Sequence, residues 1–116
     1  MISLVVFQWS NSFETLWPEL ATASGVRLDV AQPTPVLLEA SASRRDAITL
    51  HAVGGMETSA IEAIGRHAVP GSTVLVGSAL DHRVAVRAIR SGAEEYFAMP
   101  GDLEALRTWL GDTAGD

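Results

Sequence analysis

Lysine and cysteine are both absent from this chain of 116 residues. Without cysteine, the chain offers no disulfide and no thiolate for catalysis or metal binding. Without lysine, it has no amine for a Schiff base and none to hold a nucleotide phosphate. All 8 basic residues are arginines. Several common kinds of enzyme chemistry are therefore excluded within this chain.

The chain also has too little positive charge for a nucleic-acid-binding protein. The 14 acidic residues outnumber the 8 basic ones and give a net charge of −6. Binding to a phosphate backbone needs a positive surface, so direct nucleic-acid binding is not expected. No apolar run is long enough to span a membrane, and residues 1–7 lack the basic start of a signal peptide. We therefore expect a cytoplasmic protein without a membrane partner.

What the sequence does contain is a regular alternation of strand and helix patterns. The length suits one domain, and a hydrophobic content of 47% suits a buried parallel sheet. Strands are expected at residues 2–7, 26–30, 47–52, 73–76 and 96–97. Helices are expected at residues 11–25, 35–43, 56–67, 82–91 and 103–111. This alternation predicts an α/β fold with a parallel sheet covered on both faces.

Local signals predict how individual helices begin and end. Asn11 and Glu14 have the spacing of a capping box, Gly25 is a stop signal, and Pro18 is expected to kink the helix between them. Spacing also predicts the inward-facing side chains, which are Val36, Leu37 and Ala40 in the second helix and Val84, Ala88 and Ile89 in the fourth. Gly111 is expected to end the last helix. We therefore place the domain at residues 1–111, with a tail or linker at 112–116.

The segment Gly92-Ala93-Glu94-Glu95-Tyr96, followed by Met99-Pro100-Gly101-Asp102, resembles the receiver (CheY-like) domain of response regulators. Those domains typically show Gly-Ala-Asp-Asp-Tyr after a helix, then Lys-Pro, then an acidic helix cap. The rest of the chain matches them only in its layout. The resemblance implies a flavodoxin-like three-layer sandwich of strand order 2-1-3-4-5. It also implies a cis peptide bond between Met99 and Pro100.

The chemistry of receiver domains is phosphorylation of an aspartate, aided by an acidic pair that holds magnesium, a hydroxyl group and a lysine. By resemblance, the acidic pair falls on Phe7 and Gln8, and the acceptor on His51. The hydroxyl falls on Gly77 and the lysine on Met99. Every position has lost the required group, and residues 1–13 contain no acid to hold magnesium. The resemblance thus implies a pseudo-receiver, with no catalytic residue, metal site or cofactor.

Charge placement predicts an interaction surface near the C-terminal end of the chain. Its members lie on the fourth helix, the fifth strand and the fifth helix: Arg83, Arg87, Arg90, Glu94, Glu95, Tyr96, Glu104 and Arg107. In receiver domains this face is the usual dimer surface. Opposite charges on one face can pair reciprocally across a two-fold axis, which predicts a homodimer. The alternative is a solvated charged face.

The resemblance implies a regulatory, non-enzymatic module that controls an attached effector. We expect the effector to be the AAA+ ATPase of an NtrC-like, sigma-54-dependent transcription activator. An alternative is the pseudo-receiver of a CpaE/TadZ-type pilus-assembly localisation ATPase. A second alternative is a small-ligand sensor that uses a crevice around Trp9, His51 and Met99. A third is a receiver still phosphorylated on His51 or Ser78.

Overall fold

Five parallel strands form one sheet in the order β2-β1-β3-β4-β5 in the computed structural model, which describes residues 2–42, 44–66 and 73–115. The strands are β1 (Ser3–Gln8), β2 (Arg27–Ala31), β3 (Ala47–Ala52), β4 (Thr73–Gly77) and β5 (Glu95–Ala98). The predicted fold class and strand order are confirmed. The predicted strand bounds agree with the observed ones to within one residue.

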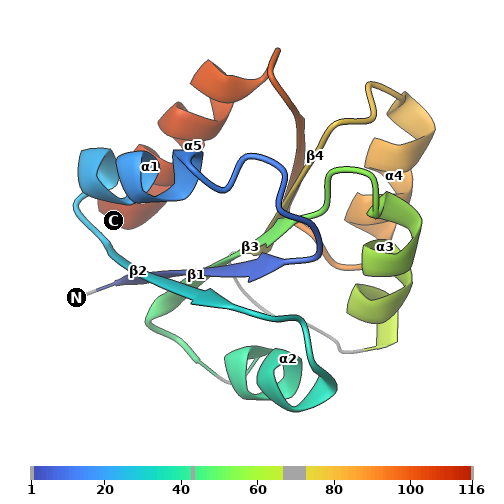
Figure 1. Ribbon diagram of the computed structural model, residues 1–116, viewed down its shortest axis with the longest axis horizontal. Helices are drawn as coiled ribbons and strands as arrows, with labels where there is room; N and C mark the ends of the chain where they lie inside the picture. Colours follow the sequence, from blue (N-terminus) through green and yellow to red (C-terminus); the bar gives the residue numbers. More distant parts are fainter. Residues whose placement is uncertain (1, 43, 67–72, 116) are drawn as a thin grey trace.

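Helices cover both faces of the sheet, as Figure 1 shows. One face carries α1 (Leu16–Ser24) and α5 (Leu103–Gly115), and the other carries α2 (Pro35–Ala42), α3 (Glu57–Arg66) and α4 (His82–Arg90). Alternate side chains of each strand point to opposite faces, so Leu4 and Val6 pack in the core beneath α1 and α5, whereas Val5 packs with Leu38 of α2. The sheet therefore separates two apolar layers. The predicted helix ends at residues 43 and 67 lie outside the described residues.

The first helix begins later than the capping-box pattern predicts. Residues 11–15 form turns instead, and the peptide N–H of Leu16 donates to the carbonyl of Phe13 at 2.9 Å. Pro18 is therefore the third helical residue, where a peptide N–H has no acceptor within the helix. The expected kink at Pro18 is wrong for this reason, because the proline removes no helical bond. Gly25 ends the helix as predicted, in the left-handed conformation at φ 70°.

Helix α2 turns a different side to the sheet from the one predicted. All three residues predicted to face inward are exposed: Val36, Leu37 and Ala40. Leu38 and Ser41 are buried instead. Leu38 packs with Val5 and Phe7, and the Ser41 hydroxyl lies 3.1 Å from that of Thr49 on β3. The prediction is wrong because it chose another apolar side of the helix as the one that faces the sheet.

Helices α4 and α5 also depart from the pattern in part. Asp81 caps α4 as predicted, since its Oδ1 accepts from the N–H of Arg83 at 2.9 Å. Ala88 is buried, but Ile89, which we expected inside, is 46% exposed because only the side of α4 bearing Ala88 meets the sheet. Helix α5 continues to Gly115, so the predicted end at Gly111 is wrong. Apolar packing of the last helical turn stabilises the helix beyond Gly111. The domain boundary at residue 111 stays a prediction.

The Met99–Pro100 peptide bond is cis, as the resemblance implies. It lies between the end of β5 and the start of α5. None of the helices within the described residues combines the length and the apolar character needed to cross a bilayer.

Candidate functional site

The carboxyl ends of the strands bring together all the residues predicted for a degenerate phosphorylation site. Parallel strands end at the same edge of a sheet, so the predicted positions converge there. Phe7 of β1 pairs in register with His51 of β3, and the N–H of Met99 donates to the carbonyl of Gly77 at 2.8 Å. The five converging residues are Phe7, Gln8, His51, Gly77 and Met99.

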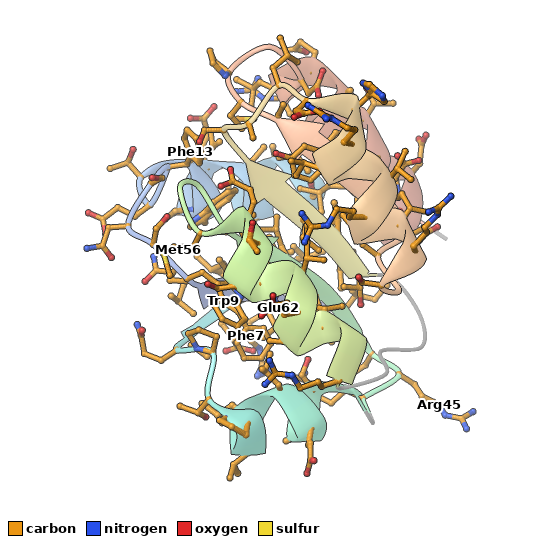
Figure 2. The ribbon with its side chains drawn as sticks, turned by 90° about the vertical axis from the view of Figure 1, so that its right-hand side faces the viewer. Phe7, Trp9, Phe13, Arg45, Met56 and Glu62 are labelled. Atoms are coloured by element: carbon orange, nitrogen blue, oxygen red, sulfur yellow. The ribbon has the colours of Figure 1, made fainter. Side chains whose placement is uncertain are left out.

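His51 is a buried, neutral imidazole. Its Nδ1 accepts a hydrogen bond from the indole Nε1 of Trp9 at 3.0 Å, and its ring stacks on Phe7 at 5.2 Å between centroids. Figure 2 shows Phe7 and Trp9 close together between α2 and α3. The side chain of His51 has no solvent exposure, and this burial lowers its pKa to about 3.

Because an indole nitrogen only donates, Nδ1 of His51 must be the acceptor and the proton resides on Nε2. Among the described residues, Nε2 has no hydrogen-bond partner. Both nitrogens are therefore shielded, one by Trp9 and the other by burial. This geometry disfavours phosphorylation of His51.

The three residues predicted to line a ligand crevice pack in different apolar clusters. Met99 packs in the core cluster beneath α1 and α5. Trp9 packs against the apolar clusters on the opposite face, and His51 stacks on Phe7 there. The sheet separates Met99 from the other two side chains, and a ligand crevice at these residues stays a prediction.

The chain holds a carboxylate at this edge that the sequence analysis missed. Glu57, at the start of α3, accepts hydrogen bonds through Oε2 from the N–H groups of Ser78 and Ala79 at 3.0 and 3.2 Å. The hydroxyl of Ser78 lies 3.4 Å from the same oxygen. Glu57 therefore holds the loop between β4 and α4. Local patterns gave no signal for this contact, because Glu57 and Ser78 are 21 residues apart.

Gly77 leaves the space that this contact needs. A Cβ on Gly77 would lie 2.6 Å from the hydroxyl of Tyr96 and 2.8 Å from Oε2 of Glu57. Such distances are too short for real Cβ atoms. The Tyr96 hydroxyl donates to the carbonyl of Ala79 at 2.9 Å. Burial, and after it the charge of Glu57, raises the pKa of Tyr96 to about 12.

The predicted interaction surface is partly assembled by the fold. Arg83, Arg87 and Arg90 lie on the exposed side of α4 at spacings of four and three residues, which places them on one stripe. Arg83 pairs with Asp81 at 3.6 Å. Within the described part of the chain, Arg87 and Arg90 form no ion pair. Two of the three arginines thus keep their charge available.

An open groove of about 540 Å³ lies between β5 and α5. Phe97 and Trp109 line it with their rings 6.3 Å apart, and Glu95, Glu104 and Asp112 supply carboxylates. The groove is therefore acidic over an aromatic base. The sequence indicated Glu95 and Glu104 as charged members of this surface and Trp109 as an apolar contact. It gave no signal for Phe97 and Asp112, since only packing shows that β5 and α5 leave a groove.

Two predicted members of the surface lie apart from this groove. Nη2 of Arg107 is 2.6 Å from Oε1 of Glu19, so its guanidinium pairs with α1. A second nitrogen of Arg107 lies 3.8 Å from Glu104. Glu94 is exposed ahead of β5 and does not line the groove. Glu95, Tyr96 and Glu104 remain, together with the arginines of α4.

The strand order and the helices on both faces define the receiver (CheY-like) fold of response regulators. A response regulator from Thermotoga maritima is similar at a TM-score of 0.70 and 15% identity, over 100% of this chain and 99% of that one. The beryllofluoride-activated NtrC4 receiver domain dimer is similar at a TM-score of 0.71 and 16% identity, over 99% and 98% of the two chains.

A structure named for the pilus assembly protein CpaE of Burkholderia thailandensis is similar at a TM-score of 0.76 and 20% identity, over 100% of both chains. At these identities the likeness concerns the fold. No family model and no curated protein matches the sequence.

Proposed function

We propose that this chain is a regulatory pseudo-receiver that acts by binding protein rather than by accepting a phosphoryl group. The observation that carries this proposal is the state of His51. At the edge of the sheet where a receiver needs exposed acidic groups, this chain has a neutral imidazole buried between Phe7 and Trp9. A phosphoryl group there would lack the acidic pair after β1 that holds magnesium and the lysine that neutralises charge.

The same proposal assigns binding to a face made of α4, β5 and α5, which we name the α4–β5–α5 face. Its basic side is the arginine stripe of α4, flanked by Val86 and Ile89, which are 42% and 46% exposed. Its acidic side is the groove between β5 and α5. Surface ion pairs alone add little affinity, so the exposed apolar side chains and the aromatic base of the groove must contribute contact area.

A second copy of this chain fits that face. In a two-fold dimer, α4 of one protomer meets the groove of its partner, and the same contact recurs on the other side of the axis. Arg87 and Arg90 would then approach Glu95, Glu104 or Asp112 of the opposite protomer. The charges on the two sides are opposite in sign. Arg87, Arg90 and Glu95 have no ion pair within the described residues.

For the attached effector we propose the AAA+ ATPase of a sigma-54-dependent transcription activator. The similarity to the NtrC4 receiver domain dimer supports this choice. A second candidate is a pilus-assembly localisation ATPase, favoured by the higher TM-score of 0.76 to the CpaE structure and by a similar CheY-like TadZ protein from Pseudomonas aeruginosa. Sequencing the gene beyond the codon for residue 116 tests both candidate effectors. A Walker A motif with a sigma-54-contacting loop supports the first, and a ParA/MinD-like ATPase the second.

The loss of phosphorylation is tested directly with acetyl phosphate and Mg²⁺, followed by intact mass spectrometry. A parallel sample with beryllofluoride and Mg²⁺ is followed by tryptophan fluorescence. An active receiver domain serves as the positive control. We expect neither the mass nor the fluorescence of this chain to change. A phosphoryl adduct on any residue would contradict the proposal.

A further inference from the structure

The loop between β4 and α4 is held in place through both backbone polar groups of one residue, Ala79. Its N–H donates to Oε2 of Glu57 at 3.2 Å, and its carbonyl accepts from the hydroxyl of Tyr96 at 2.9 Å. The N–H of Ser78 donates to the same carboxylate oxygen at 3.0 Å. Glu57, the loop and Tyr96 are thus connected through one peptide segment.

The two N–H groups of Ser78 and Ala79 form a site for an oxyanion. Successive amide donors that converge on one oxygen bind anions well, and hydrogen bonds to a charged acceptor are stronger than neutral ones. Here the anion belongs to the chain itself, because Glu57 reaches the loop from the start of α3. Gly77 permits the approach, since a side chain there would meet both the carboxylate and the tyrosine hydroxyl.

The held loop forms part of the proposed binding face. A pocket of about 260 Å³ is lined by Ala79, Leu80, Ala85 of α4 and Tyr96 of β5, among others. Leu80, in the middle of the loop, is 91% exposed, and Ile89 lies one helical turn beyond Ala85. A loop that moves would therefore displace Leu80, the start of α4 and the support of Tyr96 together.

We propose that Glu57 is a positioning residue whose carboxylate serves as a built-in anion, filling the amide site of Ser78 and Ala79 and keeping the α4–β5–α5 face permanently assembled. The inference rests on the proposed function for the role of the face, but the clamp is a property of the loop alone. The site accepts a small oxyanion such as formate or acetate when the side chain of Glu57 is shortened.

The test compares Glu57→Ala and the milder Glu57→Gln with matched changes at Glu62. Glu62 lies on the same helix, where Figure 2 labels it, and pairs with Arg66 at 3.7 Å. Amide hydrogen exchange of Ser78 and Ala79 is followed by NMR. In Glu57→Ala we expect these two amides to exchange about 10- to 100-fold faster, the range expected for loss of a hydrogen bond to a charged acceptor. The Glu62 variants should exchange at the parental rate.

Rescue by free anions distinguishes an oxyanion site from a general loosening of the loop. Sodium formate added to Glu57→Ala should slow the exchange of Ser78 and Ala79 again, whereas sodium chloride at the same ionic strength should not. Parental exchange rates in both Glu57 variants, or equal effects of the two salts, would overturn the proposal.

The same variants separate the clamp from the binding function. Sedimentation of Glu57→Gln reports dimerisation, and exchange reports the loop. If the loop loosens and the dimer weakens, both proposals are supported. If the loop loosens while Arg87→Glu leaves self-association unchanged, the clamp stands and the proposed face is wrong. If the loop stays ordered, the clamp is wrong, whatever the dimer does.

Discussion

The indole Nε1 of Trp9 donates a hydrogen bond to Nδ1 of His51, 42 residues away in the sequence, at 3.0 Å. This contact joins the end of β1 to the end of β3 at the edge where receiver domains carry their chemistry. It selects the imidazole tautomer with the proton on Nε2, and the imidazole stacks on Phe7. An apolar and aromatic assembly thus stands where acidic residues would be needed.

Trp9→Phe should destabilise the fold by about 1–3 kcal/mol, because it leaves Nδ1 of His51 buried without a donor. The free energy of unfolding is measured by urea denaturation. Trp109→Phe is the matched control, since it removes an indole N–H that has no hydrogen bond within the described residues. An equal effect of the two changes would show that the Trp9–His51 bond contributes nothing specific.

Acidification should destabilise the chain through His51. The pKa of His51 in the folded state is lowered to about 3, whereas the ordinary value is 6.5. Between these values the unfolded chain binds a proton and the folded chain does not, so stability present above pH 6.5 is lost as the pH falls toward 3. His51→Phe should lose less stability over this range in urea titrations at several pH values. His82→Gln, on the exposed start of α4, should behave like the parent.

Gly77→Ala should destabilise the fold by about 1–3 kcal/mol, because a Cβ at this position meets both Tyr96 and Glu57. It should also lower the pKa of Tyr96 from about 12 toward its ordinary value, since the tyrosine must move. Tyr96 is the only tyrosine in the chain, so tyrosinate absorbance reports it alone. Gly111→Ala is the control: a Cβ there meets nothing within 4 Å. A Gly77→Ala chain as stable as this control would refute the crowding argument.

Arg87→Glu should raise the dissociation constant of the proposed dimer at least about tenfold, because it places like charges against the acidic groove of the partner. Sedimentation equilibrium measures this constant. Adding Glu95→Arg to the same chain should restore part of the affinity, because the charges on both sides of the contact are then reversed. Arg66→Glu, on the exposed end of α3, should leave the constant unchanged. If Arg87→Glu and Arg66→Glu sediment alike, the face is not the interface.

Most of the fold was predictable from the chain because strand and helix periodicity act locally. The predicted Ala47–Ala52 strand has the bounds of β3, and Gly25 ends α1 as expected. The error in α2 arose because its apolar residues follow one another closely, so the spacing did not show which of them faces the sheet. Leu38 and Ser41 are buried there, and Val36 is 76% exposed. The predicted start of the first helix at residue 11 is wrong because residues 11–15 form turns before the helix, and the local capping pattern did not distinguish such turns from a helix.

By itself, the sequence determined that strands and helices alternate, and it placed no acid at Phe7, Gln8, His51, Gly77 or Met99. Parallel α/β alternation restricts the topology to few arrangements, and the resemblance to receiver domains supplied the strand order. Only the tertiary structure decided what those positions do instead. Burial makes His51 a neutral acceptor for Trp9. The carboxylate of Glu57, 21 residues from Ser78 in the sequence, accepts hydrogen bonds from the two amides that follow Gly77. Such contacts depend on distances between strands and helices that local patterns do not encode.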